Sequence, residues 1–107
     1  MRSSTATLSA LHSPHALSIF IERMARYLRL PAGPNAFVVS LPGARRVLVG
    51  QHGRSITVDV IARDDNDLAA LMAEIESELE QSFGRVDYRN SVAISWQRQE
   101  SVPVALR

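Results

Sequence analysis

The sequence contains no cysteine, which excludes disulfide bonds, cysteine nucleophiles and thiolate metal sites. Lysine is absent too, so all twelve basic residues are arginines. No apolar run approaches the roughly 20 residues that span a bilayer, and the N-terminal residues lack the apolar segment of a signal peptide. A formal net charge of +1 favours neither nucleic acid nor an anionic membrane. These absences predict a cytoplasmic protein that binds no nucleic acid and no membrane.

The composition that remains is that of one globular domain. Hydrophobic residues make up 46% and charged residues 21% of the 107 residues, which is ordinary for a folded chain. A chain of this length has room for one hydrophobic core. We predict a single domain over residues 1–98, followed by a loosely ordered tail over residues 99–107, which contains Pro103.

The clearest pattern in the chain predicts an amphipathic helix over residues 65–83. Its apolar residues recur at helical spacing and form one stripe: Leu68, Leu71, Met72, Ile75, Leu79 and Phe83. Asp64 or Asp65 is expected to cap the first turn, and Gly84 to end the helix. The acidic residues at the start of the helix also interact favourably with the helix dipole. A helix of this length, about 27 Å, is long enough to cross a small sheet.

A second helix is predicted over residues 13–30. Ser13 and Pro14 form a typical helix start, and Pro31 follows the last predicted turn. The expected apolar stripe consists of Leu17, Phe20, Ile21, Met24 and Leu28.

Five segments alternate between apolar and polar residues and predict strands. They are residues 4–11, 36–41, 45–50, 54–62 and 92–96. Turn residues connect the middle three, namely Pro42-Gly43 and the run from Gly50 to Gly53, which favours an antiparallel meander. The resulting order is β-α-β-β-β-α-β. We therefore predict an α+β two-layer sandwich, with both helices on one face of a mostly antiparallel sheet.

The end of the predicted fold carries a resemblance. The layout, with Val86-Asp87-Tyr88-Arg89-Asn90 leading into Ala93-Ile94-Ser95-Trp96, resembles a family of small bacterial domains of unknown function. Members occur alone or fused to the N-terminus of siderophore-interacting flavoproteins. Asn90 stands where that family has an acidic residue. Arg23, Arg26 and Ser82 stand where it tends to have histidines, so no role of those histidines carries over. The resemblance implies a fold and an association with iron and siderophore metabolism.

Each candidate site in the sequence also has a simpler structural interpretation. His12 and His15 have the spacing of two metal ligands, and His52 is a candidate third ligand, but solvated imidazoles explain them better. Helix capping explains the acidic cluster Asp64, Asp65 and Asp67 better than a cation site does. Arg45, Arg46 and Arg54 form a candidate anion patch across the meander, for which a solvated sheet face is the simpler interpretation. The sequence predicts no metal site and no cofactor.

The outward faces of the two helices are candidate contact surfaces. The first helix presents Ile19, Arg23 and Arg26, and the second presents a strip of small residues, Ala70, Ala73 and Ser77, bordered by glutamates. Arginines facing glutamates within one chain explain this complementarity most simply, and a homodimer through these faces is the alternative.

For function, the sequence contains no nucleophile motif, which favours a binding or accessory module over an enzyme. Its partner would be another protein or a second copy of the chain. A small enzyme or a small-ligand-binding protein, with a site built from residues distant in sequence, is the alternative.

Overall fold

The computed structural model describes residues 1–43, 45–83 and 90–107. Its elements follow the order β1 (Arg2–Ala10), α1 (His15–Met24), β2 (Leu28–Pro31), β3 (Ala36–Leu41), β4 (Arg45–His52), β5 (Ser55–Ala62), α2 (Asp65–Ser82), β6 (Val92–Gln99) and the short 3-10 helix η2 (Val104–Leu106). Gly84, Val86, Tyr88 and Arg89, to which the sequence analysis gave roles, lie outside the described residues.

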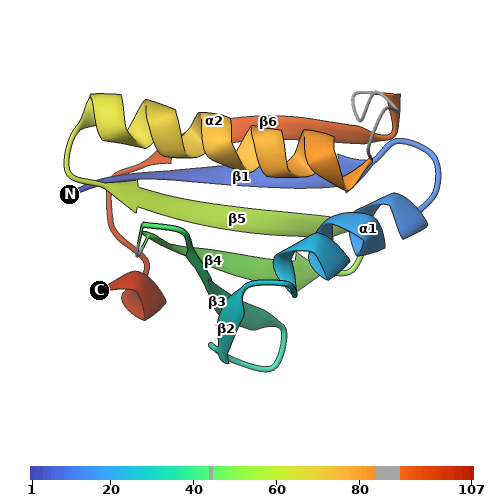
Figure 1. Cartoon of the computed structure of the whole chain (residues 1–107), viewed down its shortest axis with the longest axis horizontal. Helices are drawn as coiled ribbons and strands as arrows, with labels where there is room; N and C mark the ends of the chain where they lie inside the picture. The colour runs from blue at the N-terminus through green and yellow to red at the C-terminus, as the bar shows by residue number, and fades with distance from the viewer. Residues whose placement is uncertain (44, 84–89) are drawn as a thin grey trace.

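The six strands form one sheet in the order β2-β3-β4-β5-β1-β6, and every neighbouring pair is antiparallel. Both helices cover the same face of this sheet (Figure 1). The predicted α+β two-layer sandwich is therefore confirmed. Strand β1 comes first in the sequence but lies inside the sheet, between β5 and β6, which leaves β2 and β6 as its two edges.

Helix α2 forms as the sequence predicts. The Asp64 carboxylate caps it by accepting a hydrogen bond from the backbone N–H of Asp67 at 2.8 Å. Its apolar stripe packs on the sheet, with Leu71, Ile75 and Leu79 no more than 2% exposed. No helix in the described part of the chain is long and apolar enough to cross a membrane.

Helix α1 is shorter than predicted and ends at Met24, and edge strand β2 replaces the expected last turns. The prediction failed because Leu28 follows Met24 by four residues and so has the spacing of the helical stripe. Pro31 disfavours helical geometry at the residue before it, which explains why the chain is extended here. Leu28 and Leu30 are 72% and 59% exposed, so their apolar side chains do not belong to the core.

The core lies between the helices and the sheet. Phe20 and Met24 from α1 join the α2 stripe and the inward residues of the strands in one buried cluster. Ile94 and Trp96 are half-buried and pack against its margin.

The β4–β5 hairpin is tighter than predicted. Strand β4 continues to His52, which pairs with Ser55, so Gly53 and Arg54 alone form the turn. Gly53 has a φ of +64°, which favours glycine. Gly50 lies inside the strand, where an added Cβ would come within 2.8 Å of both the His52 ring and the Thr57 hydroxyl. Glycine at this position leaves room for that pair of side chains.

The chain after β6 packs back on the fold. Strand β6 runs to Gln99, three residues beyond the predicted strand, and η2 contacts β4 with Leu106 only 2% exposed. The predicted looseness of residues 99–107 concerns their mobility and stays a prediction.

Candidate functional site

A groove runs between α2 and the edge strand β6. It encloses about 300 Å³. Apolar side chains form most of its wall and charged side chains close one end, the lining being Ser4, Asp65, Leu68, Ala69, Met72, Trp96 and Arg98. The groove is open along the free side of β6, because no further strand among the described residues covers this edge of the sheet.

The backbone of β6 is available along the groove. In an antiparallel pair, residues alternate between those that bond to the neighbouring strand and those that point away from it. The backbone hydrogen bond from Leu11 to Ser91, at 2.9 Å, places the odd-numbered residues of β6 toward β1. The N–H and C=O groups of Ile94, Trp96 and Arg98 therefore point away from β1, toward the open edge.

Trp96 is held in place by α2. Its indole N–H donates a hydrogen bond to the Glu76 carboxylate at 3.3 Å, while its ring packs against the margin of the core. This contact satisfies the polar end of a half-buried indole. The ring is thus fixed as one wall of the groove.

Ion pairs form the charged end of the groove. Arg98 pairs with Asp65, and Arg2 lies 3.6 Å from the same carboxylate. All three side chains are more than half exposed, so these pairs position the groove wall and contribute little to stability. Farther along α2 the margin is acidic, with Glu80 exposed one turn after Glu76.

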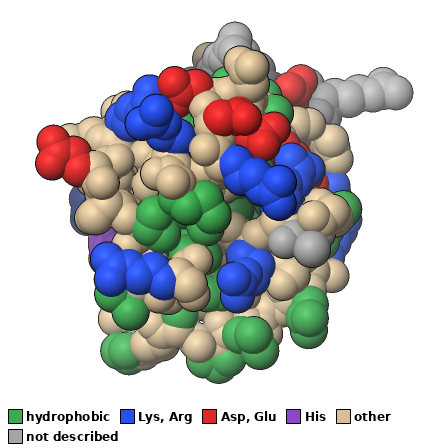
Figure 2. Space-filling view, turned by 90° about the vertical axis from the view of Figure 1, so that its left-hand side faces the viewer, with side chains coloured by type: hydrophobic (Ala, Val, Ile, Leu, Met, Phe, Trp, Pro, Cys, Tyr) green, Lys and Arg blue, Asp and Glu red, His purple; other side chains and the backbone are tan. Residues whose placement is uncertain are grey.

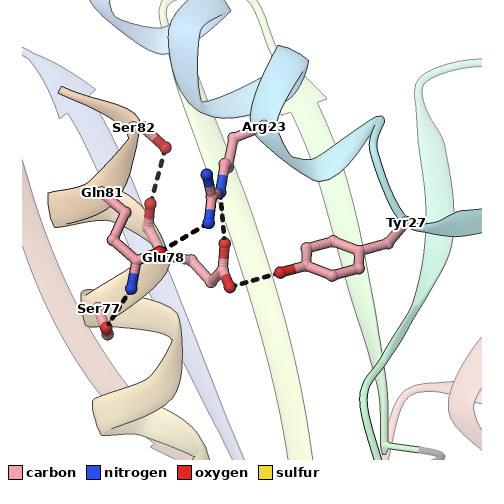
Figure 3. A network of polar contacts seen from close by, with 6 residues as sticks. All are labelled: Arg23, Tyr27, Ser77, Glu78, Gln81 and Ser82. Atoms are coloured by element: carbon pink, nitrogen blue, oxygen red, sulfur yellow. Dashed lines mark hydrogen bonds and ion pairs between the residues drawn. The ribbon is translucent and has the colours of Figure 1, made fainter. Parts of the chain in front are cut away.

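A second polar cluster joins the two helices on the other side of α2 (Figure 3). Glu78 is only 8% exposed. It accepts hydrogen bonds from the Arg23 guanidinium at 2.8 Å and from the Tyr27 hydroxyl at 2.6 Å. Arg23 also donates to the Gln81 side chain at 2.7 Å. The polar groups of this cluster bond to one another within the chain. The cluster therefore links α1 to α2.

The Glu78 carboxylate shifts the titration of both partners. Its hydrogen bond raises the pKa of Tyr27 above the ordinary value of 10.0, because ionised tyrosine would lose the donated proton and face a carboxylate. The same carboxylate raises the pKa of Arg23, since it favours the charged guanidinium. Both shifts favour the protonation states that hold the two helices together.

The predicted histidines do not come together around a common point. His12 and His15 flank the start of α1, whereas the His52 ring lies 3.0 Å from the Thr57 hydroxyl. The described residues contain no group of three or more His, Cys, Asp or Glu side chains that could hold a metal. The predicted absence of a metal site stays a prediction, which direct titration with a metal ion can test.

The predicted contact residues differ in their exposure and in their partners. Arg23 faces Glu78 within the chain, as the intramolecular interpretation of the two helix faces predicts. Ala70, Ala73 and Ser77 are exposed on α2, and Arg26 is exposed in the turn that follows α1. Ile19 is half-buried beside Arg23 in a depression of about 210 Å³ between the helices.

The predicted arginine patch is divided. Arg45 and Arg46 begin β4, whereas Arg54 lies in the turn after it, at the opposite end of the strand. An eight-residue strand is about 26 Å long, so Arg54 is too far away to share a ligand with the other two. Arg63, which the sequence analysis did not single out, follows β5 and lines the same cleft as Arg45 and Arg46.

Comparison with known proteins informs the fold. No family model matches the chain, and no curated protein sequence matches it. The chain is similar to the solved NMR structure of PA4090 from Pseudomonas aeruginosa, with a TM-score of 0.53 and 13% sequence identity. The match covers 91% of this chain and 96% of that chain. At this identity the likeness shows the fold alone, and the resemblance to the flavoprotein-associated family stays a prediction.

Proposed function

We propose that the chain is a non-catalytic accessory domain that binds an extended, basic segment of a partner protein along β6. The observation that carries this proposal is the groove between α2 and a free strand edge. Extended peptides often bind by adding a strand to such an edge, where backbone hydrogen bonds supply affinity and side-chain pockets supply specificity. The walls of the groove provide the pocket for one apolar side chain of the added segment.

Of the two edges, β6 suits this role better. Strand β2 has four residues and ends at Pro31, which has no N–H to donate. Strand β6 has eight residues and no proline, so a whole strand can pair with it.

Charge determines the kind of segment. Glu76 and Glu80 lie along the side of α2 that faces this edge, and Glu80 forms no ion pair among the described residues. Arginine or lysine side chains on an added strand would compensate these carboxylates. A second copy of the chain added at β6 would place the same acidic margin against itself, which disfavours self-pairing at this edge.

The resemblance supplies a class of partner. A domain that also occurs fused to siderophore-interacting flavoproteins has a natural partner in a separate flavoprotein of that class. We therefore extend the proposal to an association with iron and siderophore metabolism, which rests on the resemblance.

A peptide titration followed by NMR tests the groove. The probe is a synthetic peptide as long as β6 that alternates valine with arginine, and its control carries glutamate in place of arginine. We expect saturable shifts along β6 and the facing side of α2 with the basic peptide. The amides of Ile94, Trp96 and Arg98 should become protected from hydrogen exchange, because they face the added strand.

Two matched variants identify the surface. Ala69 and Ala70 are neighbouring exposed residues of α2, but only Ala69 lines the groove. Ala69→Arg should weaken peptide binding at least about tenfold, or about 1.4 kcal/mol, because it fills the groove and repels basic residues. Ala70→Arg adds the same charge elsewhere and should have little effect. Equal affinities for the two variants, or unprotected β6 amides, would contradict the proposal. Binding of a purified siderophore-interacting flavoprotein to the same two variants tests the proposed class of partner.

A further inference from the structure

A second depression, distinct from the groove, lies on the opposite side of the first turns of α2. It encloses about 540 Å³ where β4 begins and β5 ends. Its lining combines three arginines, Arg45, Arg46 and Arg63, and the acidic Asp67 with Gly43 and apolar residues that include Ile61, Ala62 and Leu71. Figure 2 shows this end of the molecule, where arginine side chains surround a group of hydrophobic ones.

The three arginines of this arginine cleft differ in their partners. Arg45 pairs with Glu74 of α2, which holds its guanidinium at the cleft margin. Arg46 and Arg63 form no ion pair within residues 1–43, 45–83 and 90–107. Asp67 is the one carboxylate among the lining residues. The cleft therefore carries more positive than negative charge, with two guanidinium groups available to a ligand.

We propose that the arginine cleft binds a small molecule that carries an oxyanion, phosphate or carboxylate, on an apolar group. The planar guanidinium group donates paired hydrogen bonds that match the oxygens of such anions. The apolar floor, which includes Ile61 and Leu71, accommodates the hydrocarbon part of the same molecule. Small-molecule sites commonly measure about 300–1,000 Å³, a range that includes this cleft.

The chemistry favours a small anion over a polyanion. Nucleic acid requires basic residues spread along an extended surface, and the whole chain has a formal net charge of only +1. Here Arg46 and Arg63 both line one depression beside apolar residues, an arrangement suited to one charged group at one end of a molecule. This inference is independent of peptide binding, since the groove and the arginine cleft have no lining residue in common.

NMR titration of the intact chain tests the site. The probes are phenyl phosphate, benzoate and inorganic phosphate, with phenol as the uncharged control. We expect saturable shifts at Gly43, Arg46, Ala62 and Arg63 with phenyl phosphate, benzoate or both, which also identifies the preferred anion. Inorganic phosphate should bind several-fold more weakly than phenyl phosphate because it leaves the floor uncovered. Phenol should produce no saturable shift.

Variants assign the binding to the arginines. Arg46→Ala and Arg63→Ala should each weaken binding about tenfold, the loss expected for one charge-assisted contact. Arg54→Ala, at the far end of β4, should leave affinity unchanged. Glu74→Gln should strengthen binding, because it releases Arg45 to the ligand. The proposal is overturned if neither organic anion binds saturably, or if Arg54→Ala weakens binding as much as Arg46→Ala and Arg63→Ala do.

Discussion

The hydroxyl of Tyr27 donates a hydrogen bond of 2.6 Å to the carboxylate of Glu78, a residue 51 positions later in the chain. Tyr27 lies between α1 and β2, and Glu78 lies in the fourth turn of α2 (Figure 3). This bond, with the Arg23 ion pair beside it, ties the connection after α1 to the longer helix. Together the two contacts give the buried Glu78 carboxylate two hydrogen-bond donors that its own helix does not supply.

Removing the Tyr27 hydroxyl should destabilise the fold. We expect Tyr27→Phe to lower the free energy of unfolding by about 1 kcal/mol, the usual net value of one hydrogen bond. Glu78→Gln should lower it by about 1–3 kcal/mol, because it also leaves Arg23 without its counter-charge. Urea unfolding of both single variants and the double variant measures their coupling. Additive single effects would show that the bond contributes nothing.

The same hydroxyl should make stability depend on alkaline pH. Since the folded state raises the pKa of Tyr27, its contribution is fully present below about pH 10, the unfolded pKa. The contribution is lost as the pH rises through the higher folded value. The stability difference between wild type and Tyr27→Phe should therefore be constant near neutrality and shrink above about pH 10. A difference that grows at alkaline pH would contradict the raised pKa.

The packing of α2 on the sheet is tested at Ile75, which is completely buried. Ile75→Ala should lower the free energy of unfolding by about 2–5 kcal/mol, since it removes buried methyl groups and leaves a cavity. For so small a domain this could be most of its stability. Ala73→Ser, on the exposed side of the same helix, is the control and should change stability by less than about 0.5 kcal/mol. An unfolding midpoint unmoved by Ile75→Ala would refute the packing described here.

We expect no specific zinc site at His12, His15 and His52. The His52 ring already lies 3.0 Å from the Thr57 hydroxyl, and two histidines alone give a weak site. Calorimetric titration with Zn²⁺ should show only weak binding, without defined stoichiometry. A stoichiometric submicromolar site that His12→Ala abolishes would prove this wrong.

The oligomeric state tests the outward helix faces. Because Arg23 pairs with Glu78 in its own chain, we expect the wild type to sediment as a monomer at high micromolar concentration. Ile19→Asp should leave that mass unchanged. If the wild type is a dimer that Ile19→Asp dissociates, the contact surface predicted from the sequence is correct. A dimer that resists this change has its interface elsewhere.

Hydrophobic periodicity was sufficient to predict the elements that depend on residues close together in the sequence. The stripe from Leu68 to Leu79 places α2 and its buried face correctly, and the alternation of Ile94 and Trp96 places β6. It failed at Leu28, where helical spacing and strand alternation agree over too few residues to be distinguished. The acidic side chains of α2 show the same limit. Glu78 has the spacing of an exposed margin residue, and only Arg23 and Tyr27, more than fifty positions away, make its burial favourable.

Both candidate sites lay beyond what the sequence alone can show. Alternation puts Trp96 on the same face of β6 as Ile94, but its contact with Glu76 and its place beside a free edge depend on the strand order. Arg63 joins Arg45 and Arg46 because β5 ends where β4 begins, whereas Arg54 is separated from them by the length of a strand. The register of the β4–β5 hairpin therefore decides which of these arginines lie together.

The interior position of β1 has a consequence for how the chain folds. Strand β1 pairs with β5 and β6, which both come much later in the sequence, and the Ser4 hydroxyl reaches the Gln97 carbonyl across 93 positions. The β3–β4–β5 meander can form from local contacts, but β1 must wait for β5 on one side and for β6 on the other. Such high contact order slows folding, because the chain loses loop entropy before distant pairings compensate for it. Nascent chains that stop before β6 should therefore expose the unpaired edge of β1 to chaperones.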